Sequence, residues 1–114
     1  MSIRNATRNT SIAHHARIAR SLSARLKGLL GEEAIYENQA LILRPCNSVH
    51  TFFMRFPIDV IFVDHADRVV KTISCLRPFR MTGIYFSAAY AIELPPGTIA
   101  STCTELHDIL TIEK

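Results

Sequence analysis

The chain has 114 residues, a formal net charge of +3, 48% hydrophobic and 20% charged residues. This composition excludes a mostly disordered chain, and the length fits one domain that folds without disulfides or a structural metal. No apolar run reaches the roughly 18 residues that a membrane-spanning helix needs. The totals therefore predict one soluble globular domain.

The basic charge is concentrated at the N-terminus. Residues 1–31 contain six Arg and Lys residues and no acidic residue, whereas residues 32–114 contain seven basic and ten acidic residues. A basic arm for an anionic surface would have this asymmetry, but a solvated segment followed by a helix with a basic outer face explains it more simply. Residues 1–31 also lack aromatic side chains, which argues against stacking-type binding of nucleic acid.

Cysteine usage bears on the cellular compartment. Cys46, Cys75 and Cys103 are odd in number and show no CxxC spacing. The first 30 residues contain no hydrophobic core of a secretory signal. We therefore expect reduced thiols and a cytoplasmic location for the chain as it stands, and an exported protein if a signal segment has been removed ahead of it.

The N-terminal third predicts one short helix. Residues 1–16 show little periodicity and form either a flexible basic segment or a first strand, so residues 17–114 are taken as the single domain. Leucines then recur at helical spacing, and Gly31 is a suitable C-terminal stop. The helix is expected near residues 22–30. Its leucines are Leu22, Leu26, Leu29 and Leu30.

Strand signals dominate the rest of the chain. The Asp-rich turn at 64–68 joins two apolar runs into a predicted hairpin over 58–74, and "IASTC" (99–103) predicts one helical turn. Short strands with a few helical turns predict a compact, β-rich α+β domain. The predicted strands cover residues 40–43, 58–64, 69–74, 90–95 and 109–113.

The stretch "CNSVHTFFMRFPIDVIFVD" (46–64) contains the best candidates for a site. Its Phe and Ile residues are expected to form core. If residues 50–56 are extended, His50 and Met54 share one face with two phenylalanines. Asp59 follows in a strand that is apolar on both faces, so its carboxylate needs a partner. The candidate partners are His50, Arg80 and the backbone N–H groups of residues 46–50.

Cys46, His50 and Asp59 suggest two kinds of chemistry. A thiolate nucleophile needs an adjacent base and an acid that orients the base, which these three residue types supply. They are also weak candidates for a zinc site, for which Cys46 and His50 are the best ligands, but the spacing matches no recognised finger or ribbon. We favour the simpler interpretation, a loop held by buried polar contacts with Cys46 as a small apolar side chain.

Glu93 and Arg80 are the other candidate ligand-binding residues. In "AIELPPGT" (91–98), Glu93 alternates with small alanines, which leaves space beside its carboxylate for a ligand or a packed helix. We favour an ion pair with Arg77 or Arg80. These arginines flank Pro78, which fixes a turn and presents a guanidinium to an anion.

Five blocks of sequence resemble the prokaryotic family called domain of unknown function 192. That resemblance implies a single β-rich α+β domain with a strongly bent, antiparallel or mixed sheet that approaches a barrel, and it implies no established reaction. The family usually has Gly before Asp108, where this chain has His107, so His107 is expected to carry a strained turn. The blocks are "RLKGLLG" (25–31), residues 40–64, "RVVKTI" (68–73), "LRPFR" (76–80) and "AIELPPGT" (91–98).

Two functional hypotheses follow. The first is a binding or accessory module for a small molecule or a protein, with a pocket near His50, Met54, Asp59 and Glu93. The second is a small hydrolase or transferase that uses His50 and Asp59 with Cys46 or a bound metal. A sheet this small leaves little room for a deep, water-excluding cavity, which favours the first. The sequence leaves open whether the chain is an enzyme, and which cofactor or oligomeric state it has.

Overall fold

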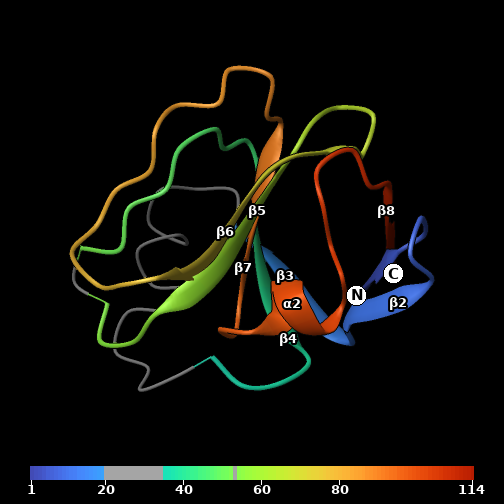
Figure 1. Cartoon of the computed structure of the whole chain (residues 1–114), viewed down its shortest axis with the longest axis horizontal. Coiled ribbons are helices and arrows are strands. Elements are labelled where there is room, and N and C mark those ends of the chain that lie inside the picture. The colour runs from blue at the N-terminus through green and yellow to red at the C-terminus, as the bar shows by residue number, and fades with distance from the viewer. Residues whose placement is uncertain (20–34, 53) are drawn as a thin grey trace.

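The computed structural model describes residues 1–19, 35–52 and 54–114 (Figure 1). These residues form strands and one short helix, as the β-rich α+β prediction requires. The predicted helix near residues 22–30 lies outside the described residues. The elements are β1 (Ser2–Asn5), β2 (Thr10–Ala13), β3 (His15–Ala19), β4 (Gln39–Leu43), β5 (Ile58–Val63), β6 (Val69–Leu76), β7 (Tyr90–Leu94), α2 (Thr98–Ser101) and β8 (Leu110–Glu113).

The strands form two sheets. The larger sheet has the order β3-β4-β7-β5-β6 and is mixed, because β3 is parallel to β4 while the other pairs are antiparallel. The smaller sheet has the order β2-β1-β8 and is antiparallel. Within the described residues the two sheets do not close into a barrel, so the fold is strongly β-rich and open rather than barrel-shaped.

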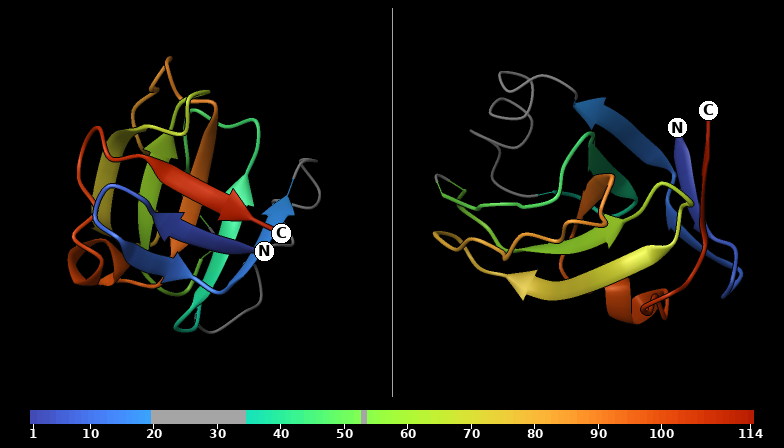
Figure 2. Two further views of the ribbon diagram at one scale, coloured as in Figure 1. Left: turned by 90° about the vertical axis from the view of Figure 1, so that its right-hand side faces the viewer. Right: turned by 90° about the horizontal axis from the view of Figure 1, so that it is seen from above.

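Residues 1–16, for which the sequence left open a flexible segment or a first strand, belong to the sheets. They contain β1, β2 and the start of β3, and Ile3, Ile12 and Ala13 are buried. Strand β1 pairs with β8, which brings the two termini side by side (Figure 2). A largely polar segment with a few spaced apolar residues thus forms strands because a strand distant in the sequence pairs with it.

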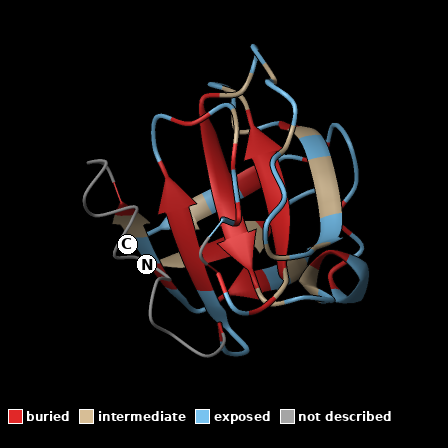
Figure 3. Cartoon of the chain, turned by 90° about the vertical axis from the view of Figure 1, so that its left-hand side faces the viewer, coloured by how far each residue is buried: buried red, intermediate tan, exposed pale blue. Residues whose placement is uncertain are grey.

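The hairpin predicted over residues 58–74 is confirmed by β5 and β6. Strand β5 lies between β6 and β7, and all six of its residues are buried (Figure 3). A continuous apolar run such as Val60–Val63 is expected for a strand that is covered on both faces. The predicted strands β4, β7 and β8 are also present, each with one end that differs by one residue.

Two separate cores cover the two faces of the larger sheet. The first core lies between the sheets, and the second core lies on the opposite face under the loops. Successive residues of a strand alternate between these cores. Members of the first core include Ile3, Ile42, Ile61, Ile92 and Leu110; members of the second include Leu41, Met54, Phe56, Val60 and Phe62.

His107 adopts the left-handed conformation that the family resemblance predicted, with φ of 75°. Its backbone N–H donates to the Val69 carbonyl at 2.8 Å, so the turn is held against β6. We expect His107→Gly to raise the free energy of unfolding by about 0.5–1 kcal/mol, because glycine removes the Cβ clash at positive φ and this gain exceeds its added unfolded-state entropy. Urea unfolding measures the change. His107→Ala keeps the Cβ and should match the wild type; a less stable glycine variant contradicts the interpretation.

Candidate functional site

The structure corrects the prediction that residues 50–56 form an extended strand. Phe52 is exposed, whereas Met54 and Phe56, which were expected on the same face, are buried. The Met54 N–H donates to the Thr51 carbonyl at 3.2 Å and forms a turn. His50 makes only an isolated bridge to Met81. The chain turns here because the hydrogen bonds of Thr51 hold it against a second loop.

Thr51 joins residues 44–57 to residues 77–88. Its N–H donates to the Arg80 carbonyl at 2.8 Å, and its carbonyl accepts from the Phe79 N–H at 3.0 Å. Its hydroxyl donates to the Arg77 carbonyl and accepts from the Arg80 N–H. Thr51 is not among the site residues that the sequence predicts. The available signal was a short hydroxyl residue within an aromatic run.

Further hydrogen bonds continue the seam between these loops. Val49 and Thr82 exchange two bonds, and the Tyr85 N–H donates to the Asn47 carbonyl at 2.9 Å. The loops appear in Figure 1 as green and orange traces that run side by side, on the side of the molecule away from both termini. We call the exposed side chains of residues 44–52, 54–57 and 77–88 the two-loop surface.

The two-loop surface combines exposed apolar side chains with positive charge. Five large apolar residues are exposed there, from 38% for Phe52 to 86% for Phe86. Four arginines are also exposed, and residues 44–57 and 77–88 contain no acidic residue. The apolar residues are Phe52, Phe79, Met81, Ile84 and Phe86. The arginines are Arg44, Arg55, Arg77 and Arg80.

Among the described residues, most of the arginines on this surface have no ion-pair partner. Arg44 stacks on the Tyr90 ring, with its guanidinium carbon 4.2 Å from the ring centroid. Arg55, Arg77 and Arg80 form no ion pair with any residue that the structure describes. The surface therefore presents guanidinium groups beside aromatic and aliphatic side chains.

Asp59 is buried and serves the backbone. Its Oδ1 accepts from the Cys75 N–H and its Oδ2 from the Ile99 N–H, both at 2.9 Å. Helix α2 has Gly97 at its N-cap and no side-chain cap of its own, so Asp59 supplies from β5 the acceptor that a local side chain usually provides. The prediction that Asp59 pairs with His50, Arg80 or the backbone of residues 46–50 is wrong. The fold brings β6 and α2 closer to the carboxylate than any of these.

Glu93 lies on the opposite face of the sheet from Asp59. In the register, Glu93 is opposite Leu41 on β4 and Val60 on β5, both members of the second core. Asp59 instead contacts Ile99 of the first core. The sheet separates the two carboxylates, so the structure does not bring them into one pocket.

The environment of Glu93 is apolar. Its side chain is buried, and burial raises the pKa of the carboxyl to about 8. Among the described residues it forms neither a hydrogen bond nor an ion pair, so the expected pairing with Arg77 or Arg80 is absent. Both arginines are exposed on the loops, whereas Glu93 lies within the sheet.

The structure does not assemble Cys46, His50 and Asp59 into a catalytic arrangement. The Cys46 thiol is buried and donates to the Ser48 carbonyl at 3.1 Å. His50 is exposed, and its ring stacks on Phe52 with centroids 5.3 Å apart. Asp59 is occupied by backbone N–H groups and does not orient the imidazole. In the described part of the chain, no three His, Cys, Asp or Glu side chains group as metal ligands.

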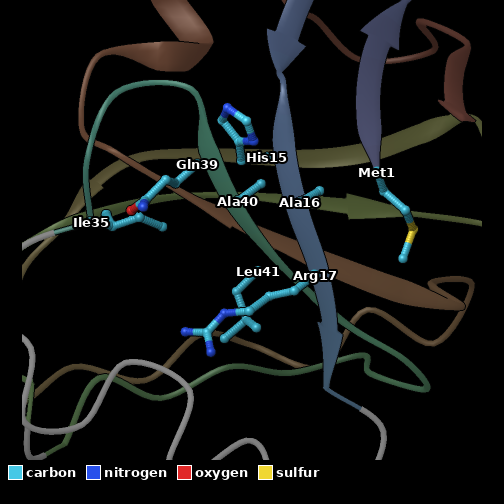
Figure 4. A pocket seen from close by; sticks show the side chains of 8 residues that line it. All are labelled: Met1, His15, Ala16, Arg17, Ile35, Gln39, Ala40 and Leu41. Atoms are coloured by element: carbon cyan, nitrogen blue, oxygen red, sulfur yellow. The ribbon is translucent and has the colours of Figure 1, made fainter. Parts of the chain in front are cut away.

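Three hollows in the described part of the surface include Cys46 but no other predicted site residue. One of about 330 Å³ lies over β3 and β4, with His15, Arg17 and Gln39 at its edge (Figure 4). Another, of about 290 Å³, lies between Pro45 and Ala88 and includes Cys46, and a third, of about 300 Å³, lies beside α2. The first depends on the parallel pairing of β3 with β4, which no local sequence signal indicates.

Comparison with known proteins identifies the family. The family model for domain of unknown function 192, described as "Uncharacterized ACR", matches residues 3–112. The chain belongs to this family. It is 36% identical over 107 residues to the UPF0127 protein PH1112 of Pyrococcus horikoshii, with 91% of this chain and 92% of that protein covered. It is 32% identical to the UPF0127 protein PF1050 of Pyrococcus furiosus, with 93% of each covered.

Solved structures share the fold of this member of the domain of unknown function 192 family. A protein of unknown function from Novosphingobium aromaticivorans has a TM-score of 0.79 at 17% identity and covers 97% of this chain and 82% of its own. A protein from Sinorhizobium meliloti has a TM-score of 0.77 at 18% identity, with 96% and 89% covered. At these identities the likeness concerns the fold alone. Within the described residues, no helix has the length and apolarity needed to cross a bilayer.

Proposed function

We propose that this protein is a binding module that recognises an anionic, amphipathic partner through the two-loop surface. The observation that carries the proposal is the coincidence of five exposed large apolar side chains with four arginines and no acid on two adjacent loops. Exposed apolar groups of this kind mark interaction sites when they gather together. Guanidinium groups beside them favour a partner with carboxylate, phosphate or sulfonate groups.

The loops are suited to binding because their backbones are already ordered. Thr51 and Thr82 tie the loops together, and the Tyr85 ring packs against Phe62 at a centroid distance of 4.7 Å. Ordering a flexible loop on binding costs free energy, and a loop that is held before the partner arrives avoids much of that cost. The exposed neighbours of Tyr85, Ile84 and Phe86, are thereby presented to a partner.

The catalytic alternative receives less support from the geometry. A base and its orienting acid need to be within hydrogen-bonding reach. Asp59 instead uses both carboxylate oxygens for backbone N–H groups, and His50 is exposed beside Phe52. The residues that the enzyme hypothesis needs therefore have structural or surface roles.

A fluorescent anionic amphiphile, 1-anilinonaphthalene-8-sulfonate, tests the proposal. We expect the native protein to bind it saturably, because its sulfonate and its aromatic rings match the arginines and the exposed phenylalanines. The double substitution Phe79→Ser/Phe86→Ser should weaken this binding by about tenfold or more, since each exposed ring contributes apolar contact area. Titration followed by fluorescence measures the affinity.

A matched control comes from a second exposed apolar pair. Leu106 and Ile109 are also exposed, but they lie beside Glu105 and Asp108, whose carboxylates pair with Arg8. Leu106→Ser/Ile109→Ser should leave binding of the dye unchanged. Equal losses in both double variants, or no loss in the first, would overturn the proposal. Circular dichroism of each variant establishes that the fold is retained.

A further inference from the structure

We infer that the partner of the two-loop surface is the anionic surface of a lipid bilayer. This inference rests on the proposed function and names the class of partner. Three features of the loops carry it: the exposure of the apolar side chains, the backbone hydrogen bonds that join the loops, and the sign of the surrounding charge.

The apolar side chains of the two-loop surface are exposed. Phe86 is 86% exposed, and Phe79 and Met81 are more than 60% exposed. None of the three hollows described above is lined by any of the five apolar residues. A peptide or helix that binds through apolar anchors needs pockets on its receptor. A bilayer needs none, because projecting side chains enter the boundary between headgroups and acyl chains.

The backbone beneath these side chains is hydrogen-bonded where the loops meet. Phe79 donates to the Thr51 carbonyl, and the chain at Met81 is bridged to His50. Tyr85, between Ile84 and Phe86, donates to the Asn47 carbonyl. Backbone N–H groups that lack a partner are costly where water is scarce. Loops joined in this way can approach the acyl boundary at lower cost than loops whose N–H groups depend on water.

The charge around the apolar residues matches anionic headgroups. Arg77 and Arg80 flank Phe79 in the sequence, and Arg55 lies on the neighbouring loop. Guanidinium groups pair well with phosphate oxygens, and an anionic leaflet attracts basic residues close to its surface. In Figure 1 both termini and the smaller sheet lie on the side away from these loops. The arrangement places Phe79 and Phe86 at the acyl boundary and the arginines among the headgroups.

Sedimentation with vesicles tests the inference on the full chain. We expect the protein to sediment with vesicles that contain one-third phosphatidylglycerol and not with vesicles of phosphatidylcholine alone, and we expect salt to weaken the association. Phe79→Ser/Phe86→Ser should lower the partition coefficient about a hundredfold. Arg77→Gln/Arg80→Gln should lower it about twenty-five-fold, from about fivefold for each arginine. Leu106→Ser/Ile109→Ser should partition as the wild type does.

The outcomes separate the inference from the proposed function. If the wild type fails to sediment with phosphatidylglycerol vesicles but the anionic dye still binds at the phenylalanines, the lipid inference is overturned and the binding module remains. An acidic protein segment then becomes the partner to test. If neither binding to vesicles nor binding of the dye depends on Phe79 and Phe86, the lipid inference and the proposed function are both overturned. Sedimentation that the two arginines do not affect also overturns the inference, since the charge argument requires them.

Discussion

Asp59→Asn is expected to lower the free energy of unfolding by about 3 kcal/mol. The two carboxylate oxygens of Asp59 each accept one backbone N–H, from Cys75 and from Ile99. An asparagine side chain has only one oxygen, so its NH₂ group must face one of these donors without an acceptor. The side chain is fully buried, where an unsatisfied polar group is costly and water cannot replace the lost bond.

The backbone amides of Cys75 and Ile99 are expected to lose protection from hydrogen exchange in this variant. Cys75 lies where the β5–β6 register is irregular and has φ of 53°, and Ile99 lies in the first turn of α2. Hydrogen exchange at these two amides should accelerate more in Asp59→Asn than exchange at the central residues of β5. Urea unfolding followed by circular dichroism gives the global change. A role in ligand binding alone would leave both measurements unchanged.

Asp64 provides a matched control for this substitution. Asp64 also accepts two backbone N–H groups, from Ala66 and Arg68, but both bonds go to its Oδ1. Asparagine retains that single oxygen, and Asp64 is partly exposed in a turn. Asp64→Asn should therefore cost less than about 1 kcal/mol. Similar losses at both positions would contradict the explanation by acceptor number.

The second large effect is a loss of stability with rising pH caused by Glu93. Burial raises the pKa of this carboxyl from its ordinary 4.5 to about 8 in the folded protein. Between these values the folded protein retains a proton that the unfolded chain has released. The free energy of unfolding therefore falls as pH rises through this window, by at most about 1.4 kcal/mol per pH unit and roughly 5 kcal/mol in total.

Glu93→Gln should remove this slope. Glutamine is neutral at all these pH values and has nearly the same shape, so the variant should become more stable than the wild type toward pH 8. Urea unfolding of both proteins at a series of pH values from 5 upward measures the difference between their free energies of unfolding. Other groups titrate alike in both proteins, so their contribution cancels in this difference. Glu37→Gln, at an exposed position, controls for the loss of one carboxylate. A Glu93→Gln variant that keeps the wild-type slope would show that Glu93 is not held in its neutral form.

The strands that could be predicted are those whose pattern is local. The hairpin of β5 and β6 follows from a β-rich apolar run, an Asp-rich turn and a second run, all within 58–76. Side chains alternate along a strand, so the sequence also places Glu93 and Ala91 on one face of β7, and Ile92 and Leu94 face the other way. His107 was predicted by analogy with the family, since a position that usually has glycine tends to require a positive φ.

The candidate site could be predicted only in part, because its contacts join distant segments. Asp59 was correctly expected to be buried, but its partner Ile99 is 40 residues away. The aromatic run at 52–56 was expected to form core, and Phe56 does, yet Phe52 is exposed. Which residues of an apolar loop are covered depends on the neighbouring loop, here through Thr51 and Arg80.

The sequence by itself therefore determined the β-rich class, the family, and most strands, because these depend on periodicity and residue type within short windows. Only the tertiary structure decided that β1 pairs with β8 and β3 with β4, and that Asp59 and Glu93 lie on opposite faces of one sheet. It also decided that apolar loop residues face solvent beside arginines. Each of these depends on pairing between segments far apart in the chain, which the free energy of the whole fold selects and no local pattern encodes.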